Sequence, residues 1–273
     1  MKLSLGLGPS PGPERLAKYR GPLRAYLEAR TQLAVSVDVR ETFTEIADEL
    51  DAGQLAFGWI PAATFARAGG QRRLKLLLQS IRGDQSSYFS VLFTRDESSL
   101  RTVTELAGRR IAWVGRDSSA GYVLAAHALS ESGIHPGWES FEGSHAAVVT
   151  AVASGEADAG ATFCTIDPQV LPNRIRSAGW TETVAVPGMR FRPLATFGPI
   201  PGDVLCAGRA TSYAERALFA SVAARMHLDP EGVGIVRGLF GADRFEVALP
   251  RHFRELRLAT ERLERLEQAA ERG

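Results

Sequence analysis

The sequence has few cysteines, few lysines and no long hydrophobic run. Its two cysteines, Cys164 and Cys206, lack the CxxC spacing of metal or redox sites, so we expect free thiols packed in the interior. Only three of the 32 cationic residues are lysine and the net charge is +1, which argues against general binding of nucleic acid. No apolar stretch approaches the ~18 residues of a membrane-spanning helix, so we expect no membrane insertion. The 273 residues therefore predict a globular protein of one large domain or two modest ones.

The chain also lacks the common motifs of nucleotide, metal and nucleophile sites. It has no GxxxxGK[ST] or convincing GxGxxG loop, no HExxH, no CxxC pair and no carboxylate cluster at ligand spacing. GxSxG is absent too, and a serine nucleophile outside that motif is recognisable only from geometry. We therefore expect no metal and no cofactor, and we favour a non-catalytic protein over an enzyme.

The N-terminal sequence MKLSLGLGPSPGPE does not read as a signal peptide. It has one lysine and a six-residue apolar run that proline and glycine interrupt at once. As written, the chain is expected to stay in the cytoplasm. If its start is truncated, a periplasmic or lipid-anchored location is expected instead.

Strand and helix patterns alternate along the first half of the chain. The predicted strands are 3–7, 33–39, 55–60, 88–95 and 109–115, and the predicted helices are 16–27, 43–50 and a segment that ends near Gly133. This alternation predicts an α/β fold with mostly parallel sheets.

The last third of the chain is less regular. We expect turns at 191–193 and 199–202, a strand at 203–207 and a helix at 212–226. From about Phe253, leucines recur at helical spacing among arginine and glutamate, which is typical of a solvated helix with one packed stripe.

A weak internal repeat relates two parts of the chain at a constant offset of 102 residues. TFTEIADELDAGQLAFGW (42–59) overlays SHAAVVTAVASGEADAGA (144–161), so that Phe43 matches His145 and both glycines of each copy align. Each copy reads as a hydroxyl-capped helix, a glycine stop and a strand of small residues. The repeat predicts two similar lobes, although helix–glycine–strand junctions resemble one another in any α/β protein.

Three segments start helices where a small oxyanion could bind: DSSAG (117–121), GSH (143–145) and ETF (41–43). Free backbone N–H groups, the positive end of the helix dipole and hydroxyl side chains all suit an anion. Serine and threonine are also the commonest N-caps, so ordinary capping stays open for each segment. At the start of a helix the dipole favours the neutral form of His145, which could contact an oxyanion or a substrate hydroxyl.

Other single residues have two readings. Asp203 is either a turn carboxylate or an acceptor for a ligand amine or hydroxyl, and Tyr88 is either a half-buried aromatic residue or a ligand contact. Cys164 and Cys206 more often serve as small core residues.

Taken together, these segments resemble the phosphate-, phosphite- and phosphonate-type solute-binding proteins of ABC transporters, which have the type 2 periplasmic-binding-protein fold. The matching segments cover most of the chain and include AGQLAFGWIP (52–61), YFSV (88–91), LAGRR (106–110), DSSAGY (117–122), GSHAAVV (143–149), GEADAGAT (155–162) and IPGD (200–203). The resemblance implies two α/β lobes with mixed sheets, a two-strand hinge and a ligand cleft between the lobes. Lobe 1 would comprise residues 1–88 and 204–273, and lobe 2 residues 89–203.

Carried over to this sequence, the resemblance also implies a set of ligand-binding residues. Ser118 and Ser119 with their backbone N–H groups, together with His145, would hold the oxyanion. Tyr88 would add a hydroxyl from the hinge and Asp203 would face the far end of the ligand. The remaining positions of the implied site are Phe43, Ala120, Ser144 and Thr162. The implied partners are a small anionic ligand and, if the protein is exported, an ABC permease.

Two positions depart from the pattern of that family. Ala120 stands where a third hydroxyl residue is usual, and Phe43 where tyrosine is common. Each lost hydroxyl could cost about 1–3 kcal/mol if its partner oxygen goes unpaired. The departures leave two alternatives open: a cytoplasmic enzyme on the same fold that resembles menaquinone-pathway enzymes and acts on a small carboxylate through His145, Asp203 or Cys164, or a ligand sensor.

Overall fold

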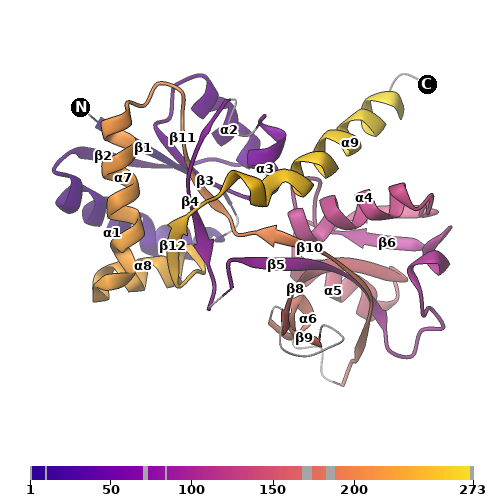
Figure 1. Ribbon diagram of the computed structural model, residues 1–273. Coiled ribbons are helices and arrows are strands. Elements are labelled where there is room, and N and C mark those ends of the chain that lie inside the picture. The colour runs from indigo at the N-terminus through magenta and orange to yellow at the C-terminus, as the bar shows by residue number, and fades with distance from the viewer. Residues whose placement is uncertain are drawn as a thin grey trace. The chain divides into compact units, whose positions relative to one another are not determined.

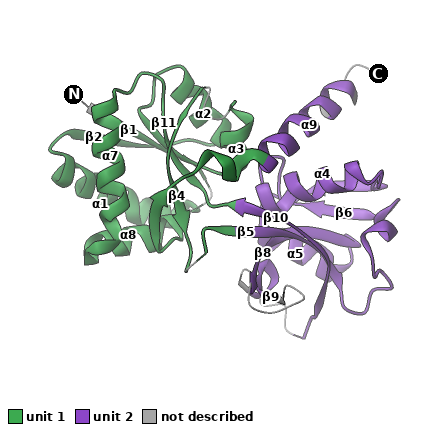
Figure 2. Cartoon of the chain, in the orientation of Figure 1, with its two compact units in different colours: residues 1–87, 201–254 green, residues 88–200, 255–273 purple. Residues whose placement is uncertain are grey.

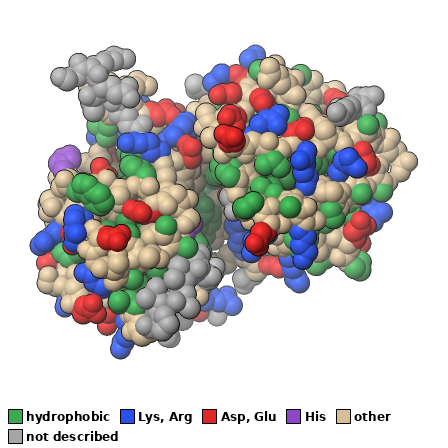
Figure 3. All heavy atoms as spheres, turned by 180° about the vertical axis from the view of Figure 1, so that it is seen from behind, with side chains coloured by type: hydrophobic (Ala, Val, Ile, Leu, Met, Phe, Trp, Pro, Cys, Tyr) green, Lys and Arg blue, Asp and Glu red, His purple; other side chains and the backbone are tan. Residues whose placement is uncertain are grey.

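The computed structural model describes residues 2–9, 11–69, 73–83, 85–167, 174–182 and 188–270. The chain divides into two compact units (Figures 1 and 2). Unit 1 comprises residues 1–87 and 201–254, and unit 2 comprises residues 88–200 and 255–273. On the face displayed in Figure 3, basic and acidic side chains are interspersed, in keeping with the near-zero net charge.

Unit 1 is built on a six-stranded sheet in the order β12-β4-β11-β3-β1-β2. Its elements are β1 (Lys2–Leu7), α1 (Pro13–Thr31), β2 (Ala34–Val39), α2 (Phe43–Asp51), β3 (Phe57–Ile60), α3 (Ala62–Arg67), β4 (Lys75–Ile81), β11 (Val204–Ala207), α7 (Tyr213–Arg225), α8 (Pro230–Phe240) and β12 (Arg244–Val247). Strand β1 pairs in parallel with β2 and β3, whereas β11 is antiparallel to both β3 and β4.

The main core of unit 1 lies between this sheet and helices α1, α7 and α8. Phe57 of β3 stacks on Phe219 of α7 with ring centroids 3.9 Å apart, and Trp59 meets Phe240 of α8 edge-on at 5.2 Å. Aromatic pairs of this kind add to the free energy of burying apolar surface. They fix α7 and α8 on one face of the sheet.

Unit 2 is built on a second mixed sheet in the order β10-β5-β8-β6-β7, with β9 paired to β8. Its elements are β5 (Ser87–Arg95), β6 (Arg110–Trp113), the π-helical turn η3 (Ser119–Val123), α4 (Leu124–Glu131), β7 (Trp138–Phe141), α5 (His145–Ser154), β8 (Ala159–Asp167), β9 (Arg174–Ala178), α6 (Gly179–Glu182), β10 (Phe191–Pro201) and α9 (Arg254–Ala270). The first residue of β5, the last residue of β10 and the first residue of α9 belong to unit 1. Strand β6 is parallel to β7 and β8, and β5 is antiparallel to β8.

The two units share a strand order. In unit 1 the sequence β2-β1-β3-β11 places three parallel strands beside an antiparallel one, and in unit 2 β7-β6-β8-β5 does the same. The repeat found in the sequence lies at corresponding places, because α2 and α5 start 102 residues apart and so do β3 and β8.

The aligned glycines explain why the two copies pack alike. A Cβ atom on Gly58 would lie 2.8 Å from side-chain carbons of Ile46 and Leu50 in α2. On Gly160 it would lie 2.6 Å from Val148 and 2.9 Å from Val152 in α5. Each strand therefore needs glycine where its helix crosses it.

Two expectations about the last third of the chain differ from the structure. The segment 191–193, expected as a turn, begins β10, and 199–201 ends it. Strand β10 lies at the edge of its sheet, where a proline does not interrupt the pairing of a central strand, so Pro193 and Pro199 are tolerated. The C-terminal helix α9 groups with unit 2, whereas the sequence-based division assigned 204–273 as a whole to lobe 1. Arg262 of α9 pairs there with Glu131 of α4 at 2.8 Å.

Candidate functional site

The predicted anion-binding loop follows the carboxyl end of β6 in unit 2. Ser118 is the N-cap of η3, and its hydroxyl accepts a hydrogen bond of 2.9 Å from the Gly121 backbone N–H. A Cβ atom on Gly121 would lie 2.3 Å from the Val114 side chain, so this tight turn requires glycine. Ser119 and Ala120 are buried in the turn, and the Ala120 carbonyl accepts a bond of 2.6 Å from the Ser90 hydroxyl of β5.

The start of α5 lies beside this loop. The backbone N–H of Val114 donates to Gly121 at 3.1 Å, and its carbonyl accepts from Gly143 at 2.8 Å. Ser144 follows as the N-cap of α5 and accepts from the Ala147 N–H at 3.1 Å. The backbone of Val114 thus joins the two helix starts.

His145 is the first residue of α5 and is a neutral group in the folded protein. Its Nδ1 atom lies 2.9 Å from the Thr162 hydroxyl of β8, and the Phe163 ring meets the imidazole edge-on at 4.9 Å. Burial lowers the pKa of His145 from 6.5 to about 4. Since Nδ1 is engaged by Thr162, Nε2 remains as the second hydrogen-bonding atom of a neutral imidazole.

Gly179 makes room for this pair. A Cβ atom there would lie 2.0 Å from the Thr162 hydroxyl oxygen, and Thr162 is fully buried. The position of the His145 ring therefore depends on β8 and on the start of α6 together.

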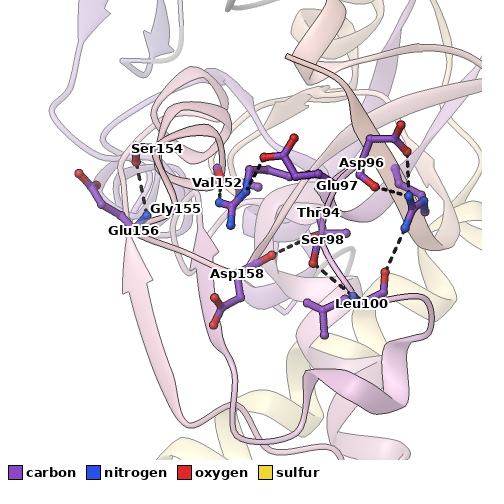
Figure 4. A network of polar contacts seen from close by, with 12 residues as sticks. Thr94, Asp96, Glu97, Ser98, Leu100, Val152, Ser154, Gly155, Glu156 and Asp158 are labelled. Atoms are coloured by element: carbon purple, nitrogen blue, oxygen red, sulfur yellow. Dashed lines mark hydrogen bonds and ion pairs between the residues drawn. The ribbon is translucent and has the colours of Figure 1, made fainter. Parts of the chain in front are cut away.

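The two ends of α5 have different electrostatics. At the C-terminal end, Arg95 donates to the Val152 carbonyl at 2.5 Å, within a polar network that includes Glu97, Thr94 and Asp158 (Figure 4). A cation stabilises the negative end of the helix dipole. The first turn at the other end has no acidic residue, so the positive end can accept an anion.

The remaining predicted residue of unit 2 lies on the strand next to this site. Tyr88 is the second residue of β5 and is half-buried. Strand β5 pairs with β8 through Val91 and Thr162. The structure thus groups six of the predicted residues near the carboxyl end of β6: Ser118, Ser119, Ala120, Ser144, His145 and Thr162. Tyr88 lies on the neighbouring strand β5.

Phe43 and Asp203 belong to unit 1. Phe43 is the first residue of α2, and its ring covers Gly8, where a Cβ atom would lie 2.1 Å from a ring carbon. The Asp203 carboxylate pairs with Arg82 at 3.3 Å, and its carbonyl accepts from the Ser80 N–H and hydroxyl, each at 2.8 Å. Asp203 therefore already has a cationic partner within its own unit.

Both cysteines are fully buried and free, as expected. Burial raises the pKa of Cys164 and of Cys206 to about 12. A thiol of that pKa provides almost no thiolate near neutral pH, which argues against the alternative in which Cys164 is a nucleophile.

Arg116 was not singled out from the sequence. It lies in the loop between β6 and η3, and its guanidinium carbon is 4.8 Å from the centroid of the Phe141 ring. The sequence signal for it is a cation two residues before the N-cap Ser118, but its aromatic partner is 25 residues further along the chain.

Within the described part of the chain, no three His, Cys, Asp or Glu side chains are grouped to hold a metal ion. Among the helices in the same ranges, none combines the length and the apolar character needed to cross a membrane.

Comparison with known proteins identifies the family of this chain. A profile of the family described as "ABC transporter, phosphonate, periplasmic substrate-binding protein" matches residues 5–253. XAC2383 from Xanthomonas citri, in a structure bound to ATP, superposes with a TM-score of 0.78 at 18% identity, covering 96% of this chain and 98% of that chain.

Two further solved structures share the fold. PhnD1 from Prochlorococcus marinus, in complex with methylphosphonate, has a TM-score of 0.70 at 17% identity over 96% of this chain and 98% of its own. The periplasmic aliphatic sulphonate binding protein SsuA from Escherichia coli has a TM-score of 0.56 at 16% identity over 98% of this chain and 88% of its own.

These matches confirm the predicted family and the predicted α/β fold with two lobes and mixed sheets. The family is described as periplasmic, so it gives no support to the expected cytoplasmic location and agrees with the periplasmic alternative. A substrate-binding protein of this kind implies a small ligand and a permease as partners. This chain belongs to the phosphonate-type periplasmic substrate-binding proteins of ABC transporters.

Proposed function

We propose that this protein binds a small oxyanion with three terminal oxygens, such as a phosphonate or phosphite, and delivers it to an ABC permease. The proposed site lies at the carboxyl end of strand β6 in unit 2. The observation that carries the proposal is the pair of hydroxyl-capped helix starts that Val114 joins through its backbone. Neither first turn contains an acidic residue. Backbone N–H groups at both starts can therefore donate to one anion.

His145 supports an anion by hydrogen bonding rather than by charge. Because its pKa is held at about 4, the imidazole is neutral near neutral pH. A neutral ring that accepts the Thr162 hydroxyl proton at Nδ1 carries its own proton at Nε2 and can donate it to an oxygen.

The number of donors favours a three-oxygen head group over phosphate. Ala120 occupies the third position of the Ser118–Ser119 run and supplies a methyl group where a hydroxyl would add a donor. A fourth oxygen left without a donor would lower affinity about 5- to 150-fold, since an unpaired polar group costs about 1–3 kcal/mol. PhnD1, which shares the fold, is recorded with methylphosphonate, a three-oxygen anion.

Tyr88 and Asp203 remain predictions of the family resemblance. Asp203 is paired with Arg82 in the same unit.

The experiment is titration calorimetry of the purified chain with methylphosphonate, phosphite, phosphate and chorismate. We expect methylphosphonate or phosphite to bind tightest. Ser119→Ala should weaken that binding about 10-fold or more, because a hydrogen bond to a charged group contributes about 1.5–3 kcal/mol. Ser132→Ala, at the opposite end of α4, is the matched control and should bind like the wild type. Binding of chorismate alone would contradict the proposal.

A further inference from the structure

Thr162 holds its hydroxyl in the interior of unit 2, against the imidazole of His145. The side chain is fully buried, and a Cβ atom on Gly179 would lie 2.0 Å from the hydroxyl oxygen. That oxygen lies 2.9 Å from His145 Nδ1, which is its one hydrogen-bond partner among the described residues. Because Thr162 is enclosed in this way, it can affect a ligand through His145 and not by direct contact.

The burial of this hydroxyl decides which of the two atoms donates the hydrogen bond. A hydroxyl proton in the interior costs free energy when it has no acceptor. If a protonated Nδ1 donated to Thr162, the hydroxyl proton would have no acceptor within the described ranges. If the hydroxyl donates to an unprotonated Nδ1, that proton is satisfied. The second arrangement is therefore favoured.

This arrangement fixes the tautomer of His145. Burial keeps the imidazole neutral near neutral pH, so the ring carries a single proton. With Nδ1 as the acceptor, the proton lies on Nε2, which is then a hydrogen-bond donor. In the other tautomer Nε2 would carry a lone pair, and a lone pair repels an anionic oxygen.

His145 places this choice at the start of α5. It is the first residue of the helix, after the N-cap Ser144. The Cα–Cβ bond of a helical residue tilts toward the N-terminus of the helix, so the ring projects toward the end that has the free backbone N–H groups. Those groups belong to the proposed oxyanion site. A donor at Nε2 adds to them, whereas an acceptor opposes them.

We propose that Thr162 is a positioning residue that keeps His145 in the Nε2–H tautomer, so that the oxyanion site has a donor at this atom and not an acceptor. This inference rests on the proposed function. The family resemblance implies that Thr162 is a ligand-binding position, and here its contribution passes through the imidazole.

The first test is nitrogen NMR of the whole chain with 15N-labelled histidine, without ligand. Protonated and unprotonated ring nitrogens differ widely in chemical shift, and the signals of His145 are those absent from His145→Gln. At neutral pH we expect an unprotonated Nδ1 and a protonated Nε2 in the wild type. Thr162→Val keeps the shape of the side chain without the hydroxyl and should give a mixture of the two tautomers. Thr162→Ser restores the hydroxyl and should give the wild-type pattern.

The second test is calorimetry with methylphosphonate on the same proteins. Thr162→Val should weaken binding about 3- to 10-fold, because part of the population then presents an acceptor to the anion, and Thr162→Ser should bind nearly as tightly as the wild type. Thr94→Val is the matched control, because Thr94 is also fully buried in unit 2 and its hydroxyl donates to the Asp158 carbonyl at 2.7 Å. It should lower stability and leave both the tautomer and the affinity unchanged.

The outcomes distinguish the two proposals. A protonated Nδ1 in the wild type, or an unchanged His145 spectrum in Thr162→Val, would overturn the role of Thr162 and leave the proposed function intact. Equal losses of affinity in Thr162→Val and Thr94→Val would overturn it as well, because any buried hydroxyl would then have the same effect. If the wild type shows the expected tautomer but binds no oxyanion, the proposed function fails and the tautomer has no role in binding.

Discussion

The two units build the same strand–helix junction but complete the helix start differently. In unit 1, Thr42 caps α2 and the Glu45 carboxylate accepts from the backbone N–H groups of Glu41 and Thr42 at 3.1 and 3.2 Å. In unit 2, Ser144 caps α5, and the residue at the position of Glu45 is Ala147. A carboxylate therefore occupies the start of α2, whereas the start of α5 has none.

The first helix of each unit shows the same difference. Helix α1 has no side-chain cap, has Pro13 at its first position and has Glu14 in its first turn. The corresponding start in unit 2 has Ser118 as its cap and no acid in the turn that follows. Topology is common to both units, so the proposed binding of an anion by unit 2 depends on the residues at the helix starts.

The strongest test of this difference is Ala147→Glu, which gives α5 the capping box of α2. We expect the carboxylate to accept the backbone N–H group of the N-cap and to repel an incoming anion. Affinity for methylphosphonate should fall about 100-fold or more, while the thermal unfolding midpoint stays the same or rises. Calorimetry and a thermal melt of the same preparation measure both quantities.

Ala147→Gln is the control for this substitution. Glutamine can complete a capping box without adding charge, so it should weaken binding far less than glutamate does. Equal losses for the two variants would show that crowding, and not charge, decides the outcome. Glu45→Ala in unit 1 should lower stability by about 0.5–2 kcal/mol and leave affinity unchanged.

The glycines of the repeat give a second way to compare the units. Gly160→Ala places a Cβ atom against Val148 and Val152, which are both β-branched and stiff. Gly58→Ala meets one β-branched side chain, Ile46, and the flexible end of Leu50. We expect Gly160→Ala to cost about 2–3 kcal/mol and Gly58→Ala about 1 kcal/mol of unfolding free energy. Urea unfolding measures both, and equal costs would contradict the difference in stiffness.

The sequence predicted those parts of the fold that local signals specify. The capping box at Thr42, the cap at Ser144 and the left-handed glycines Gly53 and Gly155 act within one turn of chain, and α2 and α5 begin where they indicate. Strand β10 was missed because its prolines resemble turns, and only its place at the edge of a sheet allows them. Helix α9 groups with unit 2 and forms an ion pair with α4, more than 120 residues earlier in the chain, which no local pattern indicates.

The candidate site likewise combines features that local sequence specifies with contacts between residues far apart in the chain. The helix starts at Ser118 and Ser144 could be predicted because capping is local. The hydrogen bond between His145 and Thr162 joins residues 17 positions apart in the chain. The contact of Arg116 with the Phe141 ring joins residues 25 positions apart. No local pattern indicates such pairs.

The smallest expected effect concerns the pH dependence of stability that His145 gives to unit 2. Its pKa is about 4 in the folded protein and ordinarily 6.5, so between these values the unfolded chain binds the extra proton. Stability from this group is complete above pH 6.5 and is lost as the pH falls towards 4. His145→Gln cannot take up that proton. As the pH falls over this range, the free energy of unfolding of His145→Gln should therefore decrease by about 1–2 kcal/mol less than that of the wild type. This difference is smaller than the full pKa shift would give, because the ring is partly exposed.

Urea unfolding at a series of pH values measures this difference, and His135→Gln, at an exposed position, controls for the loss of a histidine. Parallel curves for the wild type and His145→Gln would mean that the ring takes up its proton at the same pH in the folded and in the unfolded chain. The imidazole would then be charged below about pH 6.5 and would attract anions directly in that range. The pH series therefore tests whether the oxyanion site proposed for unit 2 has a neutral imidazole, in contrast to α2 of unit 1, where the Glu45 carboxylate occupies the helix start.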